Sequence, residues 1–263
     1  MTPQKLLIKL GGTLLDAPDS RHRLAREISA AAEPHRDTLN KIVVVHGGGK
    51  QMTRFLAERG VESRFVNGLR VTTPEVIDAV LKVFAGSVNA ELVTAFRAAG
   101  ARPVGLSGLD AGLVDAEVLN HELGLVGRPV RSDASLLDLL TANSYMPVVA
   151  CVAGDAAGNV YNVNADQMAV TCAASFAAES LLFLTDVDGV RGQDGAICPT
   201  LTSEQARSLI HRGVATGGMQ AKLEAAMEAL QKGVSQVLIA PGALAGIVGR
   251  LLAGETVGTR LIS

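Results

Sequence analysis

The chain has 263 residues and a net charge of −2, with 48% hydrophobic and 19% charged residues, proportions that fit a folded protein with a sizeable core and exclude a disordered chain. The near-neutral charge and the aromatic content of 3%, with no tryptophan, argue against a nucleic-acid-binding protein. No apolar run approaches the roughly 18 residues of a membrane span, and the N-terminus lacks a signal-peptide pattern, so we expect no membrane association.

The three cysteines, Cys151, Cys172 and Cys198, have no metal-binding spacing. Two of them lie in apolar segments, which predicts buried free thiols in a reducing compartment. We therefore expect a cytoplasmic protein, and we identify no protein ligand for a metal.

Short apolar runs alternate with helical patterns along the chain, which predicts an α/β fold. In chain order, the patterns predict a strand at 5–10, a helix at 19–33, a strand at 41–49, helices at 50–59 and 74–99, a strand at 101–108, hairpins or loops at 109–130, a helix at 133–143, a strand at 146–152, hairpins or loops at 153–162, a helix at 165–178, a strand at 180–187, helices at 203–212 and 219–232, a strand at 235–240, and a last short helix before 257–263. Because the strands are apolar without alternation and are separated by helices, we expect a mainly parallel sheet covered on both faces.

Two predicted strands end in glycines, at Gly11-Gly12 and at Gly47-Gly48-Gly49. Glycine lets the backbone turn sharply and bring its N–H groups close to an anion, and a following helix N-terminus favours negative charge. Neither stretch matches the dinucleotide-binding or P-loop patterns. The glycines alone are therefore compatible with either two tight turns or a phosphate-binding site.

Two lysines lie in apolar surroundings. Lys9 is inside the strand pattern "LLIKLGG" (6–12), and Lys222 lies at the edge of the apolar face of the helix that Gly217 and Gly218 open. An unpaired buried charge is costly, so each lysine must extend to solvent, pair with a carboxylate or meet an anionic ligand.

The polar stretch "NVNADQ" (162–167) lies between apolar segments. Asn164 is a good N-cap, Gln167 is placed to complete a capping box, and Asp166 in the first turn is favoured by the helix dipole. Helix capping leaves Asn162 unexplained, so a ligand-facing role for this stretch remains open beside the capping role.

Seven segments in order resemble the amino acid kinase family over nearly the whole chain. They are "KLGG" (9–12), "VVVHGGG" (43–49), "NGLRVT" (67–72), "VGLSGLDAGL" (104–113), "NVNADQ" (162–167), "LTDVDGV" (184–190) and "GGMQAK" (217–222). The resemblance implies a three-layer αβα sandwich of two lobes. Residues 1–175 would bind an acyl amino acid and form a dimer, and residues 176–263 would bind ATP.

The implied reaction is phosphoryl transfer from ATP, with Mg2+ arriving on the nucleotide, to the side-chain carboxylate of N-acetyl-L-glutamate in arginine biosynthesis. A glutamate side-chain carboxylate has a pKa of about 4.3 and is ionised at neutral pH, so the reaction needs no general base. Catalysis then depends on positioning and on cationic and N–H stabilisation of the transferred phosphoryl group. His46 is accordingly interpreted as structural.

The resemblance also implies residue roles. Lys9 and Lys222 would stabilise the phosphoryl group, and Asp166 would hold and orient both lysines. The remaining implied site residues are, for substrate, Gly48, Gly49, Arg70, Asn162 and Asn164; for phosphate, Gly11, Gly12 and Gly47; and for the nucleotide, Thr185, Asp186, Val187, Gly189, Val190, Gly217, Gly218 and Met219.

Several features depart from the family pattern or bear on assembly. Phe65 stands where some members carry a basic residue, and "GLDAG" and "LVGRPV" replace commoner forms near the substrate. The first strand begins almost at the N-terminus, whereas arginine-inhibited hexameric members carry an extra N-terminal helix. We therefore expect a homodimer without that mode of arginine feedback.

Two alternatives stay open from the sequence. One is a sibling kinase that acts on another N-acyl or a carrier-linked glutamate or aminoadipate, although "NVNADQ" and "NGLRVT" favour the free N-acetyl substrate. The other is a non-catalytic sensor of acyl amino acids, which the presence of Lys9, Asp166 and Lys222 disfavours.

Overall fold

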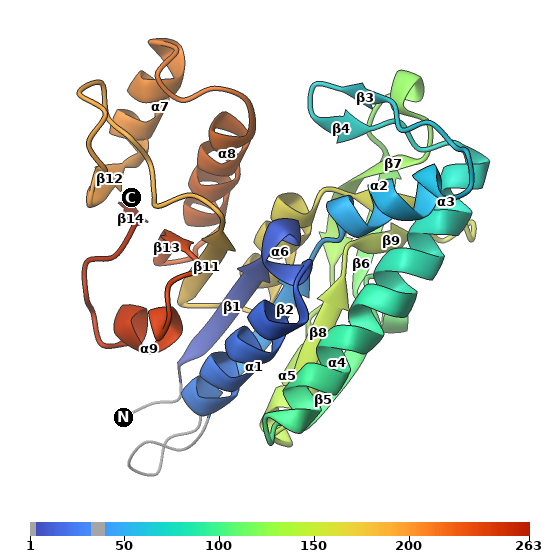
Figure 1. The fold of residues 1–263 in the computed structure, drawn as a ribbon, viewed down its shortest axis with the longest axis horizontal. Helices are drawn as coiled ribbons and strands as arrows, with labels where there is room; N and C mark the ends of the chain where they lie inside the picture. Colours follow the sequence, from blue (N-terminus) through green and yellow to red (C-terminus); the bar gives the residue numbers. More distant parts are fainter. Residues whose placement is uncertain (1–3, 33–39) are drawn as a thin grey trace.

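A computed structural model describes residues 4–32 and 40–263 (Figure 1). Residues 1–3 and position 33, the last residue of the predicted helix 19–33, lie outside the described residues. Within these described ranges, the main sheet has eight strands in the order β12-β14-β13-β11-β1-β2-β8-β5. Their bounds are β1 Lys5–Leu10, β2 Lys41–His46, β5 Pro103–Ser107, β8 Met146–Ala150, β11 Ser180–Thr185, β12 Thr200–Thr202, β13 Gln236–Pro241 and β14 Thr259–Ile262.

The predicted parallel sheet is confirmed. All pairings from β5 across to β13 are parallel, whereas β14 runs antiparallel to β13 and carries β12 with it. The short strands β12 and β14 were not predicted, because three or four residues at a sheet edge show too little apolar pattern to be separated from a loop.

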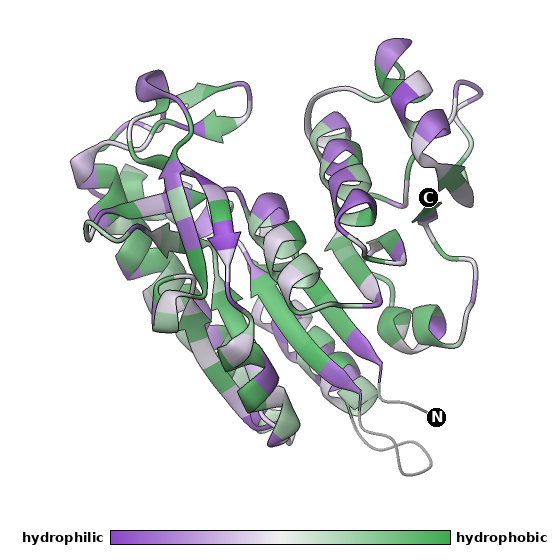
Figure 2. Ribbon diagram, turned by 180° about the vertical axis from the view of Figure 1, so that it is seen from behind, coloured by the Kyte–Doolittle hydropathy of each residue, from purple (hydrophilic) through white to green (hydrophobic). Residues whose placement is uncertain are grey.

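Helices cover both faces of the sheet and make three layers (Figures 1 and 2). Helices α1, α4 and α9 pack together on one face, and α5 and α6 cover the other, with α8 packed beside α6. The helix bounds are α1 Pro18–Ala32, α2 Gly49–Ala57, α3 Pro74–Val80, α4 Asn89–Ala98, α5 Ser135–Ala142, α6 Ala165–Ser175, α7 Ser203–His211, α8 Gly217–Gln231 and α9 Ile247–Leu252. Short 3-10 turns lie at η1 Gly12–Leu15, η3 Asp110–Gly112 and η4 His121–Leu123.

The predicted helix 74–99 is one continuous helical segment, but its middle is widened. Residues Leu81–Val88 (η2) form a π-helical stretch between α3 and α4. Such stretches interrupt the ordinary hydrogen-bond spacing and occur frequently near functional sites. One face of this stretch packs directly on the glycines that follow β2, as the close approach of Phe84 to Gly48 shows.

The segments that the sequence left as hairpins or loops form a small closed sheet, β10-β7-β6-β9. The strands are β6 Val114–Val118, β7 Val126–Ser132, β9 Val152–Gly154 and β10 Val160–Val163. The pair β6–β7 and the pair β9–β10 are both antiparallel hairpins.

A separate two-stranded hairpin, β3 Phe65–Val66 and β4 Leu69–Arg70, was not predicted. Its two turn residues, Asn67 and Gly68, have positive φ angles of 50° and 79°. An Asn-Gly pair is the preferred sequence for the two-residue turn that requires positive φ at both positions. The dipeptide therefore carried a usable signal for this hairpin.

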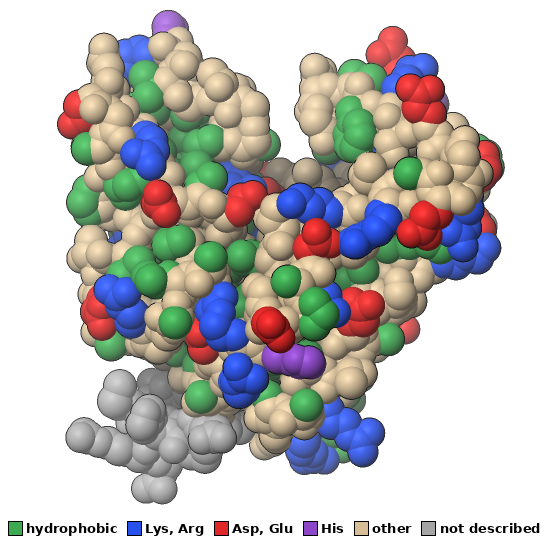
Figure 3. Space-filling view, in the orientation of Figure 1, with side chains coloured by type: hydrophobic (Ala, Val, Ile, Leu, Met, Phe, Trp, Pro, Cys, Tyr) green, Lys and Arg blue, Asp and Glu red, His purple; other side chains and the backbone are tan. Residues whose placement is uncertain are grey.

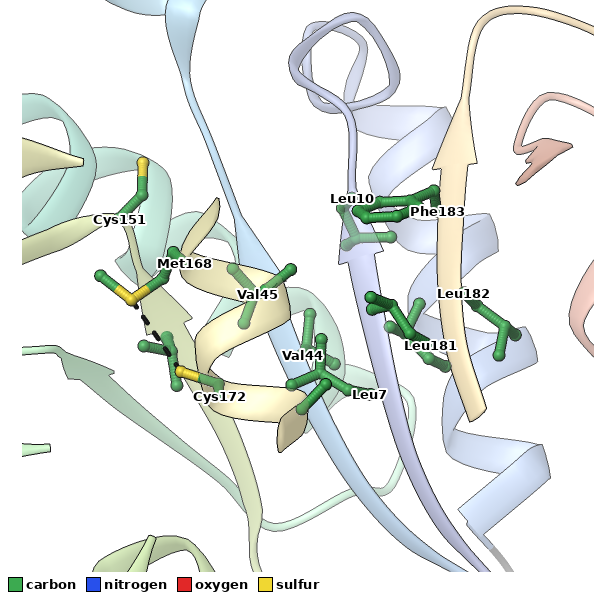
Figure 4. Packing of buried hydrophobic residues seen from close by; sticks show 14 of the residues in the cluster. Leu7, Leu10, Val44, Val45, Cys151, Met168, Cys172, Leu181, Leu182 and Phe183 are labelled. Atoms are coloured by element: carbon green, nitrogen blue, oxygen red, sulfur yellow. Dashed lines mark hydrogen bonds between the residues drawn. The ribbon is translucent and has the colours of Figure 1, made fainter. Parts of the chain in front are cut away.

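The core lies between the central strands and the helices on either side (Figures 2 and 4). Leu7, Val44 and Phe183 come from three neighbouring strands, and each is completely buried. On α6, Cys172 and Met168 contact each other through sulfur at 3.9 Å within the same core. Non-alternating apolar strands are expected where both faces of a parallel sheet are covered.

The space-filling view shows a hollow between two projecting parts of the molecule (Figure 3). One part carries α7 and α8, and the other carries β3 and β4 (Figures 1 and 3). Over residues 4–32 and 40–263, none of the helices has the length and apolarity that crossing a bilayer requires.

We predict that Gly48→Ala destabilises the fold while Gly49→Ala does not. A Cβ atom at position 48 would lie 2.8 Å from a ring carbon of the buried Phe84, whereas one at position 49 would have open space within 4 Å. Overpacking against a rigid ring costs about 1–3 kcal/mol. Urea unfolding of both variants tests this, and equal stability of the two would show that Phe84 moves aside freely.

Candidate active site

Two lysines from opposite ends of the chain meet one buried aspartate. The Nζ of Lys9 lies 2.6 Å from Oδ1 of Asp166, and the Nζ of Lys222 lies 3.2 Å from Oδ2 of the same carboxylate. The side chains are 8%, 17% and 11% exposed for Lys9, Lys222 and Asp166. The contact that the family resemblance implied is therefore present, and the charges pair with each other instead of extending into solvent.

The strand β1 and the helix α6 bring this arrangement about. Lys5 and Lys9 are four residues apart on a strand, so their side chains lie on the same face. Lys5 donates to the carbonyl oxygen of Phe176 at the C-terminal end of α6, at 2.9 Å. Lys9 meets Asp166 in the first turn of the same helix. The helix therefore runs antiparallel to the strand, held at both ends by lysines of β1.

Charge balance controls the protonation of Asp166. Burial by itself raises the pKa of a carboxyl group, but the charges of Lys9 and Lys222 outweigh burial and hold the pKa of Asp166 below its ordinary value. The carboxylate is ionised at neutral pH, and its lowered pKa and the pairing of both oxygens with ammonium groups make it a poor general base. Two cations and one anion leave one net positive charge at this point of the site.

The two glycine turns lie side by side at the carboxyl ends of β1 and β2. The N–H of Gly11 donates to the carbonyl oxygen of Leu184 at 2.9 Å, which fixes the first turn to β11. A Cβ atom on Gly12 would lie 3.4 Å from the backbone nitrogen of Gly49. Helix α2 begins at Gly49, and the first N–H groups of a helix have no partner within it. Backbone donors therefore collect beside the lysine–aspartate cluster.

A cavity of about 170 Å³, which we call the arginine pocket, adjoins these turns. It brings together all five residues that the resemblance implied for substrate, and Gly47. The lining residues are Gly47, Gly48, Gly49, Phe65, Gly68, Leu69, Arg70, Phe84, Val126, Cys151, Asn162, Val163, Asn164 and Ala165. Ala165 precedes Asp166, so the pocket ends next to the lysine–aspartate cluster.

Arg70 is a buried cation without a protein counter-charge among the described residues. Its residue is 8% exposed, and burial lowers the pKa of its guanidinium. Nη2 donates to the carbonyl oxygen of Gly49 at 3.1 Å and to Oγ1 of Thr53 at 2.8 Å, and Nη1 donates to Ser63. Three of its five N–H donors are therefore engaged. Because both donors of Nη2 are among these three, a carboxylate can take a bidentate grip only by displacing one of these bonds.

Asn164 and Asn162 each take one of the two roles, helix capping and facing a ligand, that the sequence left open for this stretch. Oδ1 of Asn164 accepts from the N–H groups of Asp166 and Gln167 at 2.8 and 3.2 Å, so Asn164 caps α6. Nδ2 of Asn162 donates to Oγ1 of Thr72 at 3.0 Å, which leaves its Oδ1 for a donor in the pocket. The expected capping box is wrong: within the described part of the chain, the Gln167 side chain makes no return bond to Asn164.

A second cavity, of about 450 Å³, lies on the other side of the hollow, and we call it the Asp186 pocket. Of the residues that the resemblance implied for the nucleotide, Asp186, Val187, Gly189 and Met219 line it. Thr185 and Val190 do not, because both are buried, and the N–H of Val190 donates to Oγ1 of Thr259 at 2.8 Å.

The glycines that open α8 lie beside this second cavity without lining it. Gly217 and Gly218 fall between Thr216 and Met219, which do line it, and Gly217 has a φ of +53°. Lys222 follows Met219 by one helical turn, so α8 links the Asp186 pocket to the lysine–aspartate cluster.

His46 and Cys151 take no part as titrating groups at neutral pH. Burial lowers the pKa of His46 to about 4, and its ring contacts the carbonyl oxygen of Gly47 at 2.8 Å and Nδ2 of Asn89 at 3.0 Å. This fits the structural interpretation of His46. Burial raises the pKa of the Cys151 thiol to about 12, so the thiol is uncharged. All three cysteines are free, as predicted, and Cys198 is only partly buried.

The sequence analysis did not name several residues that line the pockets or bond to their side chains: Thr53, Ser63, Thr72, Phe84 and Thr216. Thr72 closes the segment "NGLRVT", and Thr216 stands directly before the glycines of α8, so both were marked by their position. Thr53 and Ser63 carried no signal, because their contact with Arg70 depends on how α2 packs against the β3–β4 hairpin.

The side chains of the site fit a magnesium ion that is bound mainly by nucleotide phosphates better than one that is bound by protein ligands alone. Across the described ranges, no group of three or more His, Cys, Asp or Glu side chains is placed to bind a metal. Asp186 and Asp188 are the carboxylates that line the Asp186 pocket. In nucleotide sites, Mg2+ is bound by one or two protein carboxylates together with phosphate oxygens and water. Asp186 and Asp188 could supply these carboxylates.

Comparisons with known proteins agree with this geometry. The model of the amino acid kinase family matches residues 4–241. A protein from Solibacter usitatus named acetylglutamate kinase is 61% identical over 98% of this chain and 99% of its own length. A protein of the same name from Acidobacterium capsulatum is 41% identical over 98% of this chain and 99% of its own length.

A solved structure extends the similarity to the fold. N-acetylglutamate synthase from Neisseria gonorrhoeae, complexed with coenzyme A and N-acetyl-glutamate, matches with a TM-score of 0.86 and 24% identity. The match covers 99% of this chain and 59% of that one, and at this identity it supports the fold alone. The chain belongs to the amino acid kinase family.

We predict that Asp166→Asn destabilises the protein by about 3–5 kcal/mol at neutral pH, because it leaves two buried cations without their anion. Since the pKa of Asp166 is lowered in the folded state, its stabilising contribution is complete above the unfolded-state pKa and is lost as pH falls through the folded one. The difference between wild type and variant should stay constant above about pH 5 and shrink below about pH 4.

Urea unfolding as a function of pH measures this difference. Asp16→Asn is the matched control, because Asp16 pairs with Arg54 at the surface, where side chains are 39% and 57% exposed, and exposed pairs contribute little. Equal losses in the two variants would contradict the importance of the buried cluster.

Proposed function

We propose that this chain is an ATP-dependent kinase that phosphorylates the side-chain carboxylate of N-acetyl-L-glutamate, giving N-acetyl-L-glutamyl 5-phosphate, a step of arginine biosynthesis. The observation that carries the proposal is the pairing of Lys9 and Lys222 on one buried aspartate, between the arginine pocket and the Asp186 pocket. The full-length similarity to proteins named acetylglutamate kinase supports the choice of substrate.

The lining of the arginine pocket suits an acylated amino acid. Arg70 is a cation for the α-carboxylate, and Oδ1 of Asn162 is an acceptor for an amide N–H. Among the described residues that line this pocket there is no Asp or Glu, so the free α-ammonium of glutamate would find no counter-charge. Burying an unpaired ammonium is costly, and acylation removes that charge.

The chemistry follows from charge and position. The acceptor carboxylate is already ionised, so its oxygen attacks the γ-phosphoryl group without proton transfer. Lys9 and Lys222 supply positive charge where negative charge gathers on the transferred group, and glycine N–H groups of the two turns add donors. Asp166 is a positioning residue, since it holds both ammonium groups and its lowered pKa makes it a poor base. Mg2+ bound with ATP would add charge neutralisation at the phosphates, with Asp186 and Asp188 as its protein neighbours.

We propose a division into two lobes at about residue 175. The lining of the arginine pocket falls within residues 47–165, and that of the Asp186 pocket within residues 186–219. These positions support acyl amino acid binding by residues 1–175 and ATP binding by residues 176–263, and we propose that residues 1–175 also form the dimer. The pairing of Lys222 with Asp166 then joins the two lobes at the site.

We further propose a homodimer that works in the cytoplasm, in keeping with the family resemblance and the free cysteines. The mass in solution, measured by light scattering, should be twice that of the chain. A hexamer would contradict this assembly.

An ADP-release assay tests the function. N-acetyl-L-glutamate should support turnover, and N-acetyl-L-aspartate, aminoadipate and free glutamate should not. Lys222→Ala should lower kcat by about 10²-fold or more, because its charge acts on the transferred phosphoryl group. Lys232→Ala, at a surface lysine that caps the C-terminal end of the same helix and pairs with Glu228, should be close to wild type. Turnover with another acceptor only, or near-normal kcat for Lys222→Ala, would refute the assignment.

A further inference from the structure

Phe65 has unusual surroundings for a large apolar side chain. It is 51% exposed, and it lies on the two-residue strand β3 of a hairpin that does not join the main sheet. It nevertheless lines the arginine pocket. The apolar ring therefore lies partly in solvent and partly at the mouth of the candidate acceptor site.

The ring of Phe65 covers the guanidinium of Arg70. The two residues are cross-strand partners in the β3–β4 hairpin, so their side chains lie on the same face. The carbon at the centre of the Arg70 guanidinium lies 4.6 Å from the centre of the Phe65 ring. This is within the range in which an aromatic face attracts a cation, and the planar guanidinium is suited to such stacking.

The hydrogen bonds that Arg70 donates leave from the edges of its planar guanidinium, whereas the Phe65 ring lies over the face of that plane. Gly49 and Thr53 accept from Nη2, and Ser63 accepts from Nη1. The ring therefore adds a contact on the face of the guanidinium to the hydrogen bonds at its edges. When a substrate carboxylate displaces one of the hydrogen bonds that Arg70 donates, the Phe65 ring still holds the plane of the guanidinium.

We propose that Phe65 is a positioning residue for the acceptor: it holds Arg70 in the orientation that receives the substrate carboxylate. The consequence for catalysis rests on the function proposed above, whereas the effect on Arg70 itself does not. The ring touches no reacting atom, so its loss weakens acceptor binding and leaves the chemical step intact.

Kinetics test the consequence. Phe65→Leu keeps an apolar side chain but removes the aromatic face, and we expect it to raise the KM for N-acetyl-L-glutamate about two- to fivefold, the size of a partly exposed cation–π interaction. The kcat and the KM for ATP should stay unchanged. Phe65→Tyr keeps the ring and should behave like wild type. In an Arg70→Lys background, which lacks the planar guanidinium that stacks on the ring, Phe65→Leu should have a smaller effect than in wild type.

A second measurement addresses Arg70 without relying on catalysis. The Nε–H signal of Arg70 in a ¹⁵N correlation spectrum can be identified by its absence in Arg70→Lys. We expect its proton to exchange with water faster in Phe65→Leu than in wild type, and at the wild-type rate in Phe65→Tyr. A purely structural role for Phe65 would instead lower kcat and thermal stability together.

The outcomes separate the two proposals. Equal Arg70 exchange in wild type and Phe65→Leu, or a KM change that persists undiminished in the Arg70→Lys background, overturns the positioning role even if the enzyme phosphorylates N-acetyl-L-glutamate. Faster exchange in Phe65→Leu together with no turnover in wild type supports the positioning of Arg70 and overturns the proposed function.

Discussion

The site depends on one carboxylate, Asp166, which makes it possible to bury two cations at the same place. Lys9 and Lys222 come from different elements, and the free energy cost of desolvating both ammonium groups without an anion would be prohibitive. These two ion pairs also hold β1, α6 and α8 together beside the hollow. A net positive charge remains after pairing, so the same interaction that allows burial leaves the site attractive to an anion.

The parallel sheet explains why the remaining parts gather around this cluster. Carboxyl ends of adjacent parallel strands meet at one edge of a sheet, and ligands bind in the crevice there. The glycine turns after β1 and β2 are neighbours for this reason, although 34 residues lie between Gly12 and Gly47 in the chain. The π-helical stretch packs against Gly48, and the β3–β4 hairpin contacts Gly49 through Arg70. Both elements line the arginine pocket, so this pocket is built from elements that pack directly on the glycines.

The order and type of the long elements could be predicted from the sequence, because their apolar runs are long enough to show a period. The short strands β3, β4, β12 and β14 were missed for the opposite reason. For β3 and β4 the signal lay in the Asn67-Gly68 turn, whereas β12 and β14 have only their pairing at the sheet edge to define them. In the site, the motifs indicated Lys9, Arg70, Asp166 and Lys222, but the Gln167 capping box was wrong, since a good local pattern does not ensure that a side chain uses it.

The sequence by itself determined the residue types and the order of the motifs: two lysines in apolar segments, glycines at strand ends, and an aspartate in the first turn of a helix. Those are local properties, fixed by propensity, burial pattern and backbone freedom. The family resemblance implied that both lysines share one carboxylate, but only the tertiary structure decided that they do and that Arg70 has no acidic partner among the described residues. These facts depend on distances between residues far apart in the chain, which no local pattern encodes.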